Sequence, residues 1–272
     1  MILVELRKML GSRRTWATIL LIDALPTLVA VLLSLTDLGP RPGTGPAFLS
    51  AVLTDGTLFP LAALAIVLPL FLPIAVAVTA GEAIAGEAQN GTLRYLLIRP
   101  VGRTRLLVAK LVAVMAFVVV TVLVVAATAY VVGSLLLGQQ DVLGGRAVSV
   151  SGTTLSTSEL VFRTLIALAY AMLCMLGVAA IALFLSTVVE SPLGAAMGTM
   201  AVLVASTILL TLDAAHGIQP YLPTRYWLAF VDLFRDPILW RDVVRGVLLQ
   251  VVYVVVFLAA GWANFATKDI TD

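Results

Sequence analysis

The sequence predicts an all-α membrane protein with six transmembrane helices in a single domain over 1–272. The first observation is composition: 61% of the residues are hydrophobic, 12% are charged, and the mean hydropathy is +1.09. A soluble domain has roughly 45–50% apolar and about 25% charged residues. The second is that the apolar residues form runs of about 20, the length that crosses a bilayer as a helix. These runs are too long and uniform for barrel strands, so helices are predicted.

The expected spans are separated by loops rich in Gly, Pro and polar residues, and each can cross a hydrocarbon core about 30 Å thick. They cover 15–36, 57–80, 106–137, 164–189, 193–212 and 243–266. Pro60, Pro69 and Pro73 fall in the second span and are expected to bend or break it, because proline removes a backbone donor.

The N-terminal "ILVELRKMLGSRR" at 2–14 is weakly amphipathic and is expected to form an interfacial helix on the membrane surface. A cleaved signal peptide is the alternative. The apolar run that follows is long, contains Asp23 and lacks a small-x-small cleavage site, so we expect an uncleaved first span.

Lys and Arg in short loops predict the orientation. Ten of the 17 lie on the side of the N-terminus, nine of them in 7–14 and 94–110. Seven lie on the other side: Arg41, Arg146, Arg163, Arg225, Arg235, Arg241 and Arg245. Both termini are therefore expected in the cytoplasm, with the charges after 220 offset by nearby aspartates. The preference for Arg over Lys is typical of a GC-rich bacterial genome, which favours a bacterial inner membrane.

Between the second and third spans, residues 81–111 read "GEAIAGEAQNGTLRYLLIRPVGRTRLLVAKL", with an unusual density of charge. The second helix is expected to run through Gln89 and to stop at Gly91, which has no Cβ penalty in the left-handed region. A short helix, "TLRYLLI", is then predicted from Thr92, with leucines on one face. Arg99 before Pro100 ends it, and Thr104 is expected to cap the third span.

The basic residues of this loop, including Arg103, could simply hold it at an anionic leaflet, at about 1 kcal/mol each. That interpretation does not explain the leucine-faced helix. It also fails to explain Glu82 and Glu87, which anionic lipid would repel. A protein partner on the cytoplasmic side explains all three features.

This stretch resembles the loop of ABC-2 type permeases, the membrane subunits of ATP-binding-cassette exporters. The resemblance rests on Glu87, Gly91, Thr92, Leu93, Leu96, Arg99 and Pro100. It implies that 87–100 is a coupling helix that docks into a groove of the ATPase, with Glu82 and Glu87 paired to basic groups there. The full set of candidate coupling residues is Glu82, Glu87, Gly91, Thr92, Leu93, Arg94, Leu96, Leu97, Arg99 and Pro100.

The resemblance implies the permease subunit of an exporter that moves a hydrophobic or amphipathic cargo, drug-like or lipid-like. The chain is expected to be no enzyme, because none of its three lysines follows a glycine as a phosphate-binding loop requires. Two separate ATPase subunits would bind ATP and Mg²⁺. The other expected partners are a second copy or a sister permease and membrane lipid; the net charge of +2 does not favour nucleic acid. A secondary carrier and a non-transporting anchor of a regulatory ATPase remain alternatives.

Four further features carry weaker hypotheses. Asp23 could line a pathway or sit near the interface, and Lys110 is expected to extend its amine toward the cytoplasmic interface. Gly194 and Gly198 form a GxxxG pattern that packs helices within the chain or between copies. Aromatic residues in 213–241 predict an outer re-entrant or interfacial segment. No metal site is expected, because such a site needs clustered His, Cys or carboxylate ligands, and one His with one Cys cannot supply the cluster.

Overall fold

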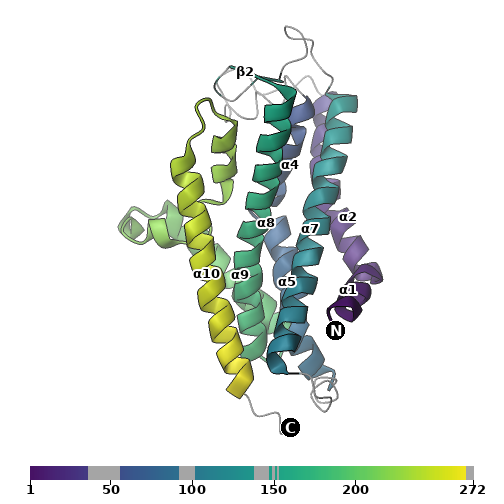
Figure 1. The fold of residues 1–272 in the computed structure, drawn as a ribbon, viewed down its shortest axis with the longest axis vertical. Coiled ribbons are helices and arrows are strands. Elements are labelled where there is room, and N and C mark those ends of the chain that lie inside the picture. Colours follow the sequence, from purple (N-terminus) through teal and green to yellow (C-terminus); the bar gives the residue numbers. More distant parts are fainter. Residues whose placement is uncertain (36–55, 92–101, 138–146, 149–150, 152, 268–272) are drawn as a thin grey trace.

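The structure is a computed structural model that describes residues 1–35, 56–91, 102–137, 147–148, 151 and 153–267. Six of its helices are long and apolar enough to cross a membrane, and they run side by side along the long axis (Figure 1). They are α2 (Arg13–Leu35), α5 (Phe71–Gln89), α7 (Arg103–Leu136), α8 (Thr157–Val188), α9 (Pro192–Thr211) and α10 (Trp240–Thr267). The predicted helical architecture, with six helices that could each span a membrane, is confirmed.

Short elements complete the described part. They are α1 (Ile2–Leu10), η1 (Gly56–Leu58), α4 (Phe59–Val67), β1 (Ala147–Val148), β2 (Thr154–Leu155), η2 (Asp213–Ala215), η3 (Gln219–Tyr221) and η4 (Trp227–Phe234). The strands pair antiparallel, with Ala147 opposite Leu155. Both α1 and the C-terminal end of α10 lie at one end of the bundle, here the terminal end; the opposite end is the loop end (Figure 1).

The second expected span is two helices. α4 ends at Val67 and α5 begins at Phe71, with Pro69 in the break between them. Proline cannot donate to the helical ladder, which explains the interruption, whereas Pro73 is tolerated in the first turn of α5. Beyond the expected span boundary at residue 80, α5 continues to Gln89, which confirms the prediction that the helix runs through Gln89. Gly91 then has φ +67, the left-handed stop that the sequence predicts.

Helix α8 is the central element and packs against α4, α5, α7, α9 and α10. The close approach of α4 to α7 depends on Gly133. A Cβ there would lie 2.6 Å from the Phe59 Cβ atom and 2.4 Å from the Gly56 carbonyl oxygen. By contrast, α10 exposes a row of apolar side chains, including Val244, Leu248 and Val252. Exposed apolar faces of this kind suit contact with lipid.

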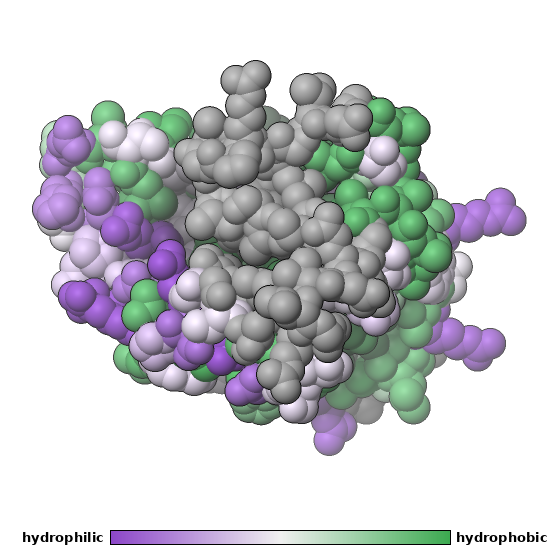
Figure 2. All heavy atoms as spheres, turned by 90° about the horizontal axis from the view of Figure 1, so that it is seen from above, coloured by the Kyte–Doolittle hydropathy of each residue, from purple (hydrophilic) through white to green (hydrophobic). Residues whose placement is uncertain are grey.

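Seen from the loop end, hydrophobic residues form much of one rim, whereas hydrophilic residues gather on the side where α10 and residues 213–239 lie (Figure 2). Residues 212–239, here the return segment, lead from α9 to α10 through three 3₁₀ helices. Part of it lies beside the middle of α10. There the Gln250 amide donates to the Pro223 carbonyl at 2.8 Å, and the Tyr253 hydroxyl donates to the Tyr221 carbonyl at 2.9 Å.

The far part of the return segment is held by α8. The Tyr170 hydroxyl donates to the Tyr226 carbonyl at 2.7 Å. The Arg163 guanidinium, which is buried, donates to the carbonyls of Leu233 and Arg235 at 3.1 and 3.0 Å. Irregular backbone at membrane depth is tolerated only where protein satisfies its polar groups. These polar side chains of α8 and α10 therefore account for how the segment can pack among membrane helices.

Candidate functional site

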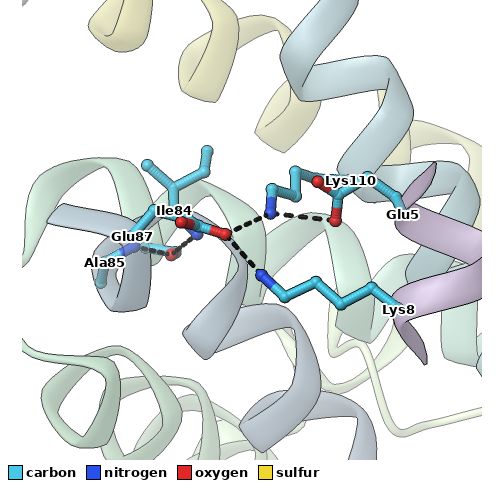
Figure 3. Close-up of polar contacts among 7 residues, drawn as sticks. Glu5, Lys8, Ile84, Ala85, Glu87 and Lys110 are labelled. Carbon is cyan, nitrogen blue, oxygen red and sulfur yellow. Dashed lines mark hydrogen bonds and ion pairs between the residues drawn. The ribbon is translucent and has the colours of Figure 1, made fainter. Parts of the chain in front are cut away.

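Four charged side chains meet at the terminal end, where α1, α5 and α7 come together; they are here the ionic cluster (Figure 3). The Lys110 amine lies 3.0 Å from a Glu5 carboxylate oxygen and 3.0 Å from a Glu87 carboxylate oxygen. The Lys8 amine lies 2.8 Å from the same oxygen of Glu87. The side chain of Lys110 is only 6% exposed, whereas that of Lys8 is 67% exposed.

The sequence builds this cluster from three separate elements. Glu5 and Lys8 are three residues apart on α1, so they lie on the same face of the helix; Glu5 contacts Lys110 and Lys8 contacts Glu87. Glu87 lies in the last turn of α5, and Lys110 lies two turns into α7. Lys110 is buried, and a buried ammonium needs partner charges to offset its lost hydration, which Glu5 and Glu87 supply. Its amine reaches the terminal end, and the expectation that this end is the cytoplasmic interface stays a prediction.

The two lysines differ in their energetics. Lys110 is enclosed and bridges two carboxylates, so its removal would leave both without this partner in a poorly hydrated place. Lys8 faces solvent. Its hydrogen bond to Glu87 is the main reason that its pKa lies above the ordinary value. Because Lys8 is mostly exposed, solvent screening keeps its contribution to stability small.

A hollow of about 180 Å³ opens beside the cluster. Its lining includes Glu5, Lys8, Glu82, Glu87 and Lys110. Glu82 is exposed, and the ion pairs found among the described residues do not include it. The two candidate coupling carboxylates therefore differ: Glu87 is bound within the chain, and Glu82 faces outward. In the same described part, no group of three or more His, Cys, Asp and Glu converges as a metal site.

Ser186 of α8 fixes the same end of α5. Its buried hydroxyl donates to the Gly81 carbonyl at 2.8 Å. It also accepts from the backbone amides of Ile84 at 3.1 Å and Ala85 at 2.9 Å (Figure 3). The end of α5 that carries Glu82 and Glu87 is thereby tied to α8 as well as to α1 and α7. Sequence analysis missed this serine, whose only signal is a hydroxyl within an apolar run.

Most of the predicted coupling helix lies outside the described residues: Thr92, Leu93, Arg94, Leu96, Leu97, Arg99 and Pro100. Two expectations about the residues that follow this helix in the sequence, Arg103 and Thr104, are wrong. The Arg103 guanidinium does not face lipid; it donates to the Phe265 and Ala266 carbonyls at 2.9 and 2.8 Å, closing the C-terminal end of α10. Thr104 is not the cap of α7, which starts after Gly102, and its hydroxyl accepts from the Trp262 indole at 2.8 Å.

Asp23 lies in the middle of α2, where it is buried and accepts a hydrogen bond from the Thr128 hydroxyl of α7. Asp23 is thus satisfied by a polar neighbour on another helix. A place in a pathway and a place near the interface both stay predictions.

The GxxxG pair packs against its own chain. A Cβ on Gly194 would lie 2.8 Å from a methyl of Val189, and one on Gly198 would lie 3.2 Å from a methyl of Leu185. Packing within the chain accounts for both glycines, and a contact between copies stays a prediction.

Comparison with known proteins adds one family. No curated protein matches the chain. The sequence pattern of a family described as "Protein of unknown function (DUF2705)" matches residues 28–271, which include all of the six long helices except residues 13–27 of α2. The chain therefore belongs to the DUF2705 family.

Proposed function

We propose that this chain is the permease subunit of an ATP-driven ABC exporter in a bacterial inner membrane. Its N- and C-termini would lie in the cytoplasm, at the terminal end of the bundle. Two separate ATPase subunits would bind ATP and Mg²⁺, and a second copy or a sister permease would complete the pathway. The cargo would be hydrophobic or amphipathic, in keeping with the apolar spans.

The observation that carries this proposal is the position of the ionic cluster. Glu87 lies four residues before Gly91, where α5 stops and the sequence that resembles a coupling helix begins. The cluster joins that end of α5 to α1 and α7, and Ser186 joins it to α8. A force applied to 87–100 by a partner would therefore reach four helices through direct contacts.

The different surroundings of Glu82 and Glu87 suit different roles for the two carboxylates. Glu82 is exposed and could meet a basic group of an ATPase. Glu87 is bound to Lys8 and Lys110, so its role would be to connect the docking segment to the bundle. The resemblance assigns both residues to docking; we propose docking for Glu82 and transmission for Glu87.

In this mechanism, ATP would draw two ATPase subunits together and bring the two 87–100 segments with them. The motion would shift α2, the α4–α5 pair and α9, and open an apolar cleft to the outside. The experiment is purification of the chain from its own membranes, identification of co-purified ATPases by mass spectrometry, and measurement of ATP turnover. Absence of any ATPase from the purified complex would contradict the proposal.

The orientation has its own test. On a background without Cys174, which is buried, single cysteines would be labelled with a membrane-impermeant maleimide from outside. Positions in 40–50 and 144–156 should react, and position 91 should not. Labelling at 91 from outside would reverse the orientation.

A secondary carrier is the second candidate, and two observations favour it. Asp23 is a buried carboxylate in the middle of a span, and the α4–α5 pair is a broken helix. Carriers use both features to bind coupling ions. Transport into proteoliposomes separates the candidates: an exporter needs ATP and its ATPase, whereas a carrier responds to an ion gradient and loses transport in Asp23→Asn. Cargo-stimulated hydrolysis separates an exporter from a non-transporting anchor.

A further inference from the structure

Two arginines at the loop end have no ion-pair partner among the described residues. Arg241 and Arg245 lie one turn apart at the start of α10, and both are exposed. The ion pairs of the described part include Arg235 with Asp232 but neither of these two. Asp242 lies three residues before Arg245 on the same helix, a spacing that brings two side chains near each other, but the ion pairs found among the described residues do not join the two.

An apolar groove lies beside these arginines, between α8 and α10. It has a volume of about 340 Å³. Its lining is almost entirely hydrophobic: Ile166, Ala169, Tyr170, Leu173, Trp240, Val243, Val244, Val247 and Leu248. Leu248 and Val244 are about half exposed, so the groove opens at the surface of the bundle. In a multi-pass membrane protein, this surface meets lipid.

The arginines border the groove on α10 without lining it. Position 241 is three residues before 244, and position 245 is three residues before 248, so the arginines lie next to the groove residues Val244 and Leu248 along the helix. Arg241 and Arg245 lie nearer the loop end, and Leu248 lies toward the bundle centre. Trp240, also part of the lining, is half exposed at the same level, as aromatic residues at a headgroup boundary commonly are.

We propose that this groove binds one phospholipid, with an acyl chain between α8 and α10 and its phosphate on Arg241 and Arg245. Guanidinium groups bind phosphate oxygens through paired, charge-assisted hydrogen bonds. The apolar lining complements a hydrocarbon chain, and two unpaired cations complement an anionic headgroup. The site also explains why arginines accumulate at the loop end, against the distribution that orients the chain. It does not depend on an ATPase partner or on the exporter proposal.

Brominated lipid tests the site, because bromine quenches nearby tryptophan. The chain would be placed in phosphatidylcholine vesicles with increasing fractions of brominated phosphatidylglycerol. Quenching that is lost in Trp240→Phe is assigned to Trp240. The fraction of anionic lipid that gives half-maximal quenching should be roughly 5-fold higher in Arg245→Gln than in wild type. In the double variant Arg241→Gln with Arg245→Gln it should be roughly 25-fold higher.

Arg225→Gln is the matched control, because Arg225 is an exposed arginine of the return segment that does not line the groove. It should leave the curve unchanged. Ala169→Phe should reduce quenching by filling the groove while the arginines stay in place. Equal curves for wild type and the double Gln variant would overturn the proposal. So would competition by free inorganic phosphate, or efficient cross-linking of Leu248→Cys between two copies, which would make the groove an interface between chains.

Discussion

The two ends of the bundle hold their irregular parts in different ways. At the terminal end, α1 is joined to α5 and α7 by opposite charges, with Lys110 between Glu5 and Glu87. At the loop end, the return segment is joined to α8 and α10 by side chains that donate to backbone carbonyls, such as Tyr170 and Gln250. Charge pairs can exchange partners when another charge arrives, whereas a carbonyl bound by a buried side chain has no such alternative.

This difference assigns different roles to the two ends. Under the proposed function, a charged partner would rearrange the terminal end, which adjoins the segment proposed to meet one. The return segment is expected to stay fixed at its buried contacts, because breaking the bond from Arg163 to Leu233 or from Gln250 to Pro223 would leave a polar group in an apolar surrounding. Substitutions that change charge should therefore lower stability mainly at the terminal end. Substitutions that change packing should lower it mainly at the loop end.

The largest effect is expected at Lys110. Lys110→Met removes the shared cation, so that Glu5 loses this ion pair and Glu87 keeps only that with the mostly exposed Lys8; this should cost about 3–5 kcal/mol. Thermal unfolding in detergent measures it. Adding Glu5→Gln and Glu87→Gln to Lys110→Met should recover most of the loss, because no uncompensated charge then remains. Failure of this rescue would mean that Lys110 acts through its packing rather than its charge.

The next effect is expected at Gly246 at the loop end. A Cβ there would lie 1.9 Å from the Tyr170 hydroxyl and 2.9 Å from the Tyr226 Cβ atom. Gly246→Ala should therefore displace the return segment and cost about 1–3 kcal/mol. Gly217→Ala is the control, since nothing lies within 4 Å of a Cβ at Gly217. Equal thermal stability of the two variants would show that the return segment is not fixed at this contact.

The smallest effect is expected at Lys8. Its pKa is raised, mainly by the hydrogen bond to Glu87, so the charged form stabilises the fold fully below the unfolded pKa of about 10.4. That contribution is lost as pH rises through the higher folded pKa. Lys8→Met should cost under about 1 kcal/mol at pH 8, and the difference from wild type should shrink above about pH 11. A difference that grows with pH would contradict this assignment.

The fold was largely predictable because its signals are local. Hydrophobic length identifies the spans, and Asn90–Gly91 identifies the end of α5. The ionic cluster was not predictable, because Glu5, Glu87 and Lys110 come together only through packing of helices that are distant in sequence. The contacts of Arg103 and Ser186 could not be predicted either, because their partners are also distant in sequence. Each is a polar residue near or within an apolar run, and sequence alone does not tell which neighbour it meets.

The most direct test of the account is recruitment of an ATPase by the terminal end. Glu82→Lys reverses an exposed charge that makes none of the ion pairs of the ionic cluster. Leu96→Asp introduces a charge into the predicted docking face. Asp213→Lys, an equal charge reversal in the return segment, is the control. At equal expression, Glu82→Lys and Leu96→Asp should lower co-purified ATPase and ATP turnover by about tenfold or more, and Asp213→Lys should lower neither. Wild-type recruitment and turnover in both Glu82→Lys and Leu96→Asp would contradict the proposal that this loop couples the chain to an ATPase.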